Sequence, residues 1–451
     1  MMKRQLVAIL GFYISLHFAA SQPFLGVNYG QVADNLPPPS ATARLLASTA
    51  FQKLRLYDTN QDIISSVETN PSISLLVGVA NGDIPLLASS PSSAASWLSS
   101  HLPSLKSISS ISVGNEVLSF AGASISSQLV PAMENLLSAL PPSSNIKIST
   151  VHAMDILSQS DPPSAGAFHT EYSTYLDPLL AFLNRTGSPL MINPYPYFAY
   201  TSDTRPETLA FCLFQPNPGR VDGNSGLTYM NMFDAQVDAV HAALDAKGFT
   251  NVDILVAETG WPHSGDANEP GATPENAREY NGNLVAHLRS LAGTPRVPGK
   301  SVETYLFALY DEDLKPGAAS ERSFGLFSLN LTENYDAGLL KNGSSSTNFA
   351  PGPAPSPSTS IPETSASAPA PVQTQIPSSQ VAPTQSTTIS NPSISPSSGC
   401  SVSVRGIEAN GTIQPVTGTD CQLPTGTASH LSVKRFSISI FICHYVLSLY
   451  L

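Results

Sequence analysis

Two glutamates directly follow short apolar runs in this sequence. Glu116 ends the segment ISVGNE (111–116), and Glu258 comes directly after LVA (255–257). A carboxylate beside a buried strand is unfavourable unless it faces a polar cleft or a charged partner. Two opposed carboxylates are the groups that glycoside hydrolysis needs, because one attacks the sugar and the other, with a raised pKa, protonates the leaving oxygen. The alternative for either glutamate alone is a surface or ion-paired carboxylate.

Aromatic and polar side chains stand at similar positions after other apolar runs. Flat aromatic rings stack on the apolar faces of pyranose rings, and amide, carboxylate and hydroxyl groups bind sugar hydroxyls. The candidates for such contacts are Asn28, Tyr29, Arg55, Tyr57, Asp58, Asn193, Tyr195, Tyr197 and Trp261. The alternative for each aromatic residue is packing in the core, and this is the expectation for Phe198.

A third group of candidates follows the last apolar run. Glu312, Lys315 and Glu321 are close together in a chain of which only 12% of the residues are charged. They either bind substrate at a cleft wall or form an ion-pair network, and the sequence leaves both interpretations open.

The elements that must position these residues are short β-rich runs that alternate with segments of helical length. The runs are 24–29, 53–57, 73–79, 108–113, 146–151, 189–192, 252–257 and 302–309, and the helix-like segments include 40–50, 94–101, 126–140, 231–246 and 273–291. This alternation predicts an α/β fold, a closed (β/α)8 TIM barrel over residues 22–341, with the site at the carboxyl ends of its strands. A doubly wound open sheet is the alternative. However, GVNYGQ (26–31) lacks the glycine spacing of a phosphate loop, so no nucleotide site is expected.

The two ends of the sequence differ from the barrel region. The expected segments are a signal peptide over 1–21, cleaved before Gln22, a Pro/Ser/Thr-rich stalk over 342–399, a short polar segment over 400–426 and a glycolipid-anchor signal over 427–451, with Gly426 as the preferred attachment site. We therefore expect a secreted protein on the outer face of the plasma membrane or in the cell wall, which contacts the membrane only through a lipid. Secretion without an anchor is the alternative. Cys400 and Cys421 could close a small loop.

Composition excludes several classes of function. The formal net charge is −12, and nucleic acid is not an expected partner because phosphate binding needs a basic face. No pair of Cys or His residues has the spacing of a zinc site. Hydrolysis by two carboxylates needs neither a metal nor an organic cofactor, so none is predicted.

Six segments carry a resemblance to a known family. They are GVNYG (26–30), RLYD (55–58), VGNEV (113–117), NPYPYFAY (193–200), VAETGWP (256–262) and ALYDEDLKPG (308–317). In this order and spacing, the region 24–340 resembles the plant β-1,3-glucanases of glycoside hydrolase family 17. The resemblance implies a (β/α)8 barrel, Glu116 as the acid/base and proton donor, Glu258 as the nucleophile, and Asn115 in contact with the sugar 2-hydroxyl. Tyr57 and the charged cluster of residues 312, 315 and 321 fall where the family has further cleft residues.

The expected function is therefore retaining endo-hydrolysis of a β-1,3-glucan, such as callose, a laminarin-like glucan or fungal wall glucan, by a monomeric enzyme. Retention predicts carboxyl groups about 5–5.5 Å apart. The alternatives are a β-1,3-glucan transglycosylase, which uses the same residues, and a non-catalytic glucan-binding protein of the wall or membrane. Callose turnover and defence both stay open as the biological role.

Overall fold

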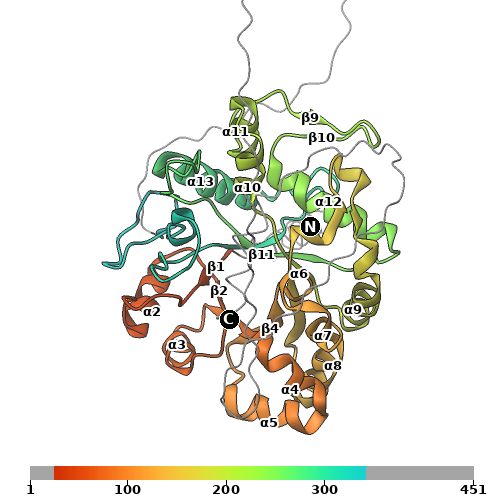
Figure 1. Cartoon of the computed structure of the whole chain (residues 1–451). Helices are drawn as coiled ribbons and strands as arrows, with labels where there is room; N and C mark the ends of the chain where they lie inside the picture. Colours follow the sequence, from red (N-terminus) through yellow and green to blue (C-terminus); the bar gives the residue numbers. More distant parts are fainter. Residues whose placement is uncertain (1–24, 342–451) are drawn as a thin grey trace, which may run out of the picture. The chain divides into compact units, whose positions relative to one another are not determined.

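The computed structural model describes residues 25–341, and the signal, stalk, polar segment and anchor predicted above lie outside the described residues. Eight parallel strands form a closed barrel, and helices surround it (Figure 1). In barrel order the strands are β1 (Leu25–Tyr29), β2 (Lys53–Leu56), β3 (Ser74–Val79), β4 (Ile108–Asn115), β5 (Lys147–Ala153), β8 (Leu190–Asn193), β11 (Ile254–Thr259) and β12 (Glu303–Leu306). The predicted (β/α)8 barrel is confirmed, and each predicted run overlaps one barrel strand.

The barrel closes where the first strand meets the last. β1 pairs in parallel with β2 on one side and with β12 on the other, with Leu25 opposite Thr304 and Val27 opposite Leu306. The Asn28 side chain adds to this junction, because its Nδ2 donates to the Leu306 carbonyl oxygen at 3.2 Å. Residues 278 positions apart in sequence are thereby brought together at the junction of the first and last strands.

Five helices match the helix-like segments of the sequence. They are α2 (Pro39–Ser48), α5 (Pro91–His101), α8 (Leu129–Ala139), α12 (Met232–Ala246) and α13 (Pro274–Ser290). The start of α13 follows the predicted pattern, since the Thr273 hydroxyl accepts from the Asn276 amide at 3.2 Å and Pro274 is the first helical residue.

Further helices and strands of the described chain were not predicted. The helices are α3 (Gln61–Val67), α4 (Ile84–Ser89), α6 (Val117–Phe120), α7 (Gly122–Ser126), α9 (Ser173–Thr186), α10 (Pro196–Ser202) and α11 (Pro206–Cys212), and two small hairpins join β6 (Leu157–Gln159) to β7 (Ala167–Phe168) and β9 (Arg220–Val221) to β10 (Thr228–Tyr229). None of the helices within residues 25–341 has the length and apolar character needed to cross a membrane.

The alternation of side chains along each strand divides the protein interior into two apolar regions. The smaller region fills the barrel with Leu76, Val151, Met191, Leu255, Ala257 and Tyr305, and the larger lies between the strands and the helices. Successive residues of a strand therefore face different regions. On β1, Val27 and Tyr29 pack in the larger region. The side chain of Asn28, between them, instead accepts hydrogen bonds from Arg55 and Tyr57 at the barrel mouth.

Candidate active site

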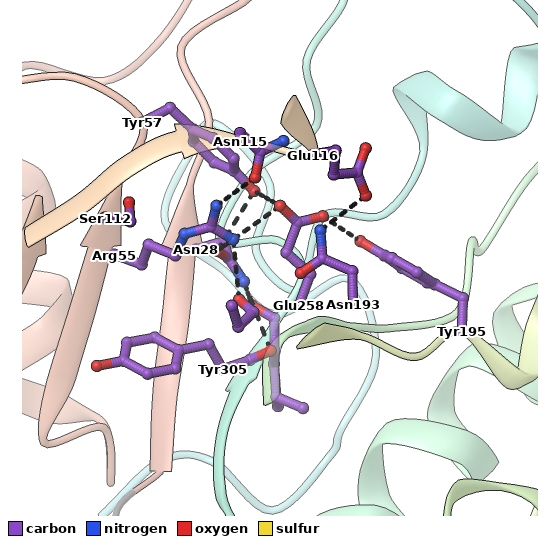
Figure 2. Close-up of polar contacts among 12 residues, drawn as sticks. Asn28, Arg55, Tyr57, Ser112, Asn115, Glu116, Asn193, Tyr195, Glu258 and Tyr305 are labelled. Carbon is purple, nitrogen blue, oxygen red and sulfur yellow. Dashed lines mark hydrogen bonds and ion pairs between the residues drawn. The ribbon is translucent and has the colours of Figure 1, made fainter. Parts of the chain in front are cut away.

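The two glutamates singled out in the sequence meet at the carboxyl ends of the barrel strands. Glu116 directly follows β4, and Glu258 is the second-to-last residue of β11. Each residue is 8% exposed. Figure 2 shows both side chains gathered with Asn28, Arg55 and other polar residues at this end of the barrel. The structure thus brings the predicted pair together in a polar, largely buried site.

Glu258 is held by three hydrogen-bond donors from two other strands. Its Oε1 accepts from Arg55 Nη1 at 2.7 Å and from the Tyr57 hydroxyl at 2.8 Å, and its Oε2 accepts from the Tyr195 hydroxyl at 2.8 Å. Burial and the charge of Glu258 raise the pKa of both tyrosines well above the usual value, so the hydroxyls stay protonated as donors. These contacts fix the carboxylate and stabilise its negative charge.

Arg55 connects the nucleophile candidate to the rest of the site. Its guanidinium is 1% exposed and donates to four oxygens, namely Glu258 Oε1, Asn28 Oδ1 at 3.3 Å, the Ala257 carbonyl at 3.1 Å and Asn115 Oδ1 at 2.7 Å. The planar fork of an arginine can make these bonds at once, whereas a lysine cannot. Sequence reasoning assigned Arg55 to sugar binding, but its donors are directed at protein groups.

Glu116 has a very different environment. Its Oε1 accepts from Asn193 Nδ2 at 2.9 Å, and within residues 25–341 its other carboxyl oxygen has no side-chain donor. Burial and the nearby charge of Glu258 raise the pKa of Glu116 to about 8, and the Asn193 hydrogen bond only partly opposes them. Glu116 is therefore the member of the pair that carries a proton near neutral pH.

The predicted charged cluster is in part an ion pair. Lys315 Nζ lies 3.1 Å from Glu312 Oε2 and 4.1 Å from the centre of the Phe307 ring, and Glu312 Oε1 accepts from the Val32 amide at 3.0 Å. Burial acts to lower the pKa of Lys315, but the carboxylates of Glu312, Glu321 and Glu258 outweigh it and raise the pKa. The ion-pair interpretation holds for Glu312 and Lys315. Contact of the cluster with substrate stays a prediction.

Three aromatic candidates for sugar binding, Tyr29, Tyr197 and Trp261, are buried in the structure. Trp261 has 0% exposure, its Nε1 donates to the Gly271 carbonyl at 2.7 Å, and its ring packs against Tyr197. Tyr29 is also buried, with its ring edge against Tyr310. In this structure none of the three side chains has exposed surface with which to contact a sugar, and the pleat of β1 places Tyr29 in the larger apolar region.

The remaining candidates lie at or near the mouth. Tyr195, Tyr57, Asn193 and Asn115 contact the two glutamates or Arg55, as described above. Asp58 accepts from Gln31 Nε2 at 3.0 Å on the exposed side of the β1 and β2 ends. Phe198 is half-buried and packs against the core beside Tyr195, as expected for a packing residue.

One residue of the site was missed. Asn81 lies two residues beyond the end of β3, at the start of a short 3-10 helix, and its side chain forms two hydrogen bonds with the main chain of Asn115. The signal that could have found it is its place as a polar residue just beyond the third apolar run. Within the part of the chain that the structure describes, no group of three or more His, Cys, Asp or Glu side chains is arranged to hold a metal ion.

The sequence of this chain matches a known protein family. Residues 25–338 match the glycosyl hydrolases family 17. The chain is 57% identical over 339 residues to glucan endo-1,3-beta-glucosidase 7 of Arabidopsis thaliana, covering 73% of this chain and 67% of that protein. It is 52% identical over 339 residues to glucan endo-1,3-beta-D-glucosidase of Olea europaea, covering 74% of each.

Solved structures agree with these sequence matches. The structure of CJP38, a beta-1,3-glucanase and allergen of Cryptomeria japonica pollen, is similar with a TM-score of 0.66 at 41% identity, over 71% of this chain and 100% of that one. A plant beta-glucan endohydrolase is similar with a TM-score of 0.63 at 37% identity, over 69% of this chain and 99% of that one. With its barrel and its paired glutamates, the chain belongs to glycosyl hydrolase family 17 and is a glycoside hydrolase.

Proposed function

We propose that the protein is an endo-β-1,3-glucanase that cleaves its substrate with retention of anomeric configuration. The observation that carries this proposal is the contrast between the two glutamates. Glu258 receives three donors, one of them a buried cation, whereas Glu116 receives one amide and has a raised pKa. The linkage is supported by the relatives, whose names describe them as glucan endo-1,3-beta-glucosidases.

The first step is a displacement at the anomeric carbon. A Glu258 carboxylate oxygen forms a bond to that carbon while the glycosidic carbon–oxygen bond breaks, and the Glu116 proton moves to the departing oxygen. In this step Asn115, whose Oδ1 accepts from Arg55 Nη2, contacts the sugar 2-hydroxyl. The products of this step are a shortened glucan and a glycosyl ester of Glu258.

The second step returns the enzyme to its starting state. Glu116, now ionised, accepts a proton from water, and the water oxygen attacks the anomeric carbon as the bond to Glu258 breaks. Two inversions give net retention. Arg55 and the two tyrosine hydroxyls stabilise Glu258 as its negative charge returns.

Activity is expected to fall as the pH rises through the pKa of Glu116, about 8. The acid works in its protonated form, so kcat/KM is sustained below this pKa and is lost above it. The measurement is a kcat/KM profile on laminarin over the pH range in which the protein stays folded. In Glu116→Ala, assayed on an aryl glycoside whose leaving group needs no proton, this alkaline limb should disappear. If it persists there, another group is the acid.

The proposed function is tested by the products of a linkage-defined β-1,3-glucan. Proton NMR during the first turnovers should show the β-anomer as the initial product, together with internal cleavage. Initial α-anomer would contradict retention. Products longer than the substrate would identify a transglycosylase, and binding without new reducing ends would identify a non-catalytic glucan-binding protein.

A further inference from the structure

Asn81 extends the pairing of β3 with β4 beyond the last paired backbone residues. The ladder between these strands ends with Val79 opposite Val113. Two residues further along the chain from each of these, Asn81 Oδ1 accepts from the Asn115 amide at 2.8 Å and Asn81 Nδ2 donates to the Asn115 carbonyl at 3.1 Å. A side-chain amide thus substitutes for a strand backbone, and it fixes the peptide groups on both sides of Asn115.

This support acts where the main chain of β4 leaves regular geometry. The pairing of β4 with β5 shifts register between Ser112 and Asn115, Gly114 has φ +73°, and Glu116 has φ 51°. A left-handed conformation is unfavourable at a residue other than glycine, so it persists only where the surroundings hold it. Glu116 is therefore placed by its surroundings and not by its own backbone preference.

Contacts on both flanks supply that constraint. A Cβ atom at Gly114 would lie 2.8 Å from Asn81 Oδ1 and 2.4 Å from Val117 Cγ2, so the chain passes too close to Asn81 for any side chain there. On the opposite flank the Glu116 amide donates to the Val151 carbonyl of β5 at 2.8 Å. The segment 114–116 is clamped between Asn81 and β5.

The contacts that clamp segment 114–116 position Glu116 more directly than Glu258. Glu258 is held by Arg55, Tyr57 and Tyr195, whereas both hydrogen bonds of the Asn81 side chain within residues 25–341 go to Asn115. Glu116 has only the Asn193 hydrogen bond on its carboxyl group and depends on its main chain for position. Loss of the Asn81 amide should therefore displace the acid more than the nucleophile, whose support meets this segment through the hydrogen bond from Arg55 Nη2 to Asn115 Oδ1.

We infer that Asn81 is a positioning residue for Glu116, which acts by clamping the Asn115 main chain and so aims the acid/base carboxyl at the glycosidic oxygen. The inference rests on the proposed function, because it assigns Asn81 to the acid/base half of that mechanism. Asn81 itself carries out no proton transfer and forms no bond to the reacting atoms.

The test compares Asn81→Ala with Asn81→Asp on two substrates. On laminarin, whose leaving group needs a proton, Asn81→Ala should lower kcat/KM by about 10- to 100-fold, since small misplacements of a catalytic group have effects of this size. Asn81→Asp keeps the acceptor for the Asn115 amide but loses the donor, so its loss should be smaller. On dinitrophenyl β-laminaribioside, whose leaving group departs without a proton, kcat/KM of both variants should stay within about twofold of the wild type.

A second readout comes from the second step of the mechanism, in which Glu116 acts as the base. On the dinitrophenyl substrate the misplaced Glu116 should slow hydrolysis of the glycosyl-enzyme and so lower kcat. Azide attacks the anomeric carbon without giving up a proton, so added azide should restore kcat and yield the β-glycosyl azide. A purely structural role for Asn81 would produce neither the dependence on leaving group nor the rescue.

The matched control is Asn135→Ala. Asn135 on α8 also donates its amide to main-chain carbonyls, those of Leu87 and Ala88 at 2.8 and 3.2 Å, but on the outside of the barrel. Its replacement should lower thermal stability to a similar extent without changing the ratio of activities on the two substrates. Equal losses on both substrates in Asn81→Ala, or wild-type activity on laminarin, would overturn the inference.

Glu116→Ala separates this failure from failure of the proposed function. If Glu116→Ala shows the leaving-group dependence and the azide rescue but Asn81→Ala does not, only the role of Asn81 is wrong. If Glu116→Ala itself shows neither, the assignment of the acid/base is wrong, and the inference falls with it.

Discussion

Replacement of Glu258 by glutamine is expected to lower kcat on β-1,3-glucan by about 10⁴-fold or more, as removal of a covalent nucleophile does in other enzymes. An amide nitrogen cannot attack the anomeric carbon and the amide oxygen is a poor nucleophile, so no glycosyl-enzyme forms. The measurement is release of reducing ends from laminarin, with product linkage determined in parallel. Wild-type activity in this variant would show that Glu258 is not the nucleophile.

The fold and the binding of glucan are expected to survive the Glu258→Gln change. The glutamine oxygen can still accept from Arg55 and Tyr57, and the guanidinium keeps its neutral acceptors Asn28 and Asn115. Circular dichroism and a glucan-binding assay serve as the controls. Loss of structure would make the activity uninformative, and Glu258→Asp, which keeps the charge but shortens the reach, would then replace it.

The second large effect is expected from Arg55→Met. This variant should have a lower free energy of unfolding and a kcat lowered by about 10³-fold, since a buried charge pair and the support of the nucleophile are lost together. Removing one partner of a buried ion pair costs roughly 3–5 kcal/mol, because the other charge is left uncompensated. Urea unfolding and laminarin hydrolysis measure the two effects.

A double-mutant cycle identifies the source of the instability. If the uncompensated Glu258 charge is responsible, Arg55→Met combined with Glu258→Gln should be more stable than Arg55→Met alone. Arg55→Lys keeps the charge but cannot reach Glu258, Asn28 and Asn115 together, so its activity should be intermediate. Wild-type kinetics in Arg55→Lys would contradict the role given to the arginine fork.

The sequence was sufficient to predict the barrel and the two glutamates, because both depend on local patterns. Each barrel strand overlaps a β-rich apolar run, and Glu116 and Glu258 each stand at the end of one. Parallel strands of a barrel place their carboxyl ends on one face, so the two residues had to be neighbours once the barrel was assumed.

The sequence was not sufficient where a side chain's role depends on distant partners. Trp261 follows the strand of the nucleophile, yet its ring is enclosed by Tyr197 and Gly271, and no local pattern encodes that direction. Arg55 donates to Glu258, a residue 203 positions away. Asn81 supports a left-handed turn that only the packed structure reveals. Long-range contacts of this kind leave no periodic signal in a single sequence.

The pairing of β1 with β12 also determines when the enzyme can first act during its synthesis. Asn28, which supports Arg55 and Tyr57, is itself anchored to Leu306, so the ribosome must deliver nearly the whole barrel before the site is complete. Nascent chains stalled at increasing lengths should therefore show no glucanase activity until β12 has left the exit tunnel. Activity in a shorter chain would mean that the site forms without closure. A cell that makes this hydrolase thus synthesises an inactive polypeptide until β12, which ends at Leu306 of 451 residues, is available to pair with β1.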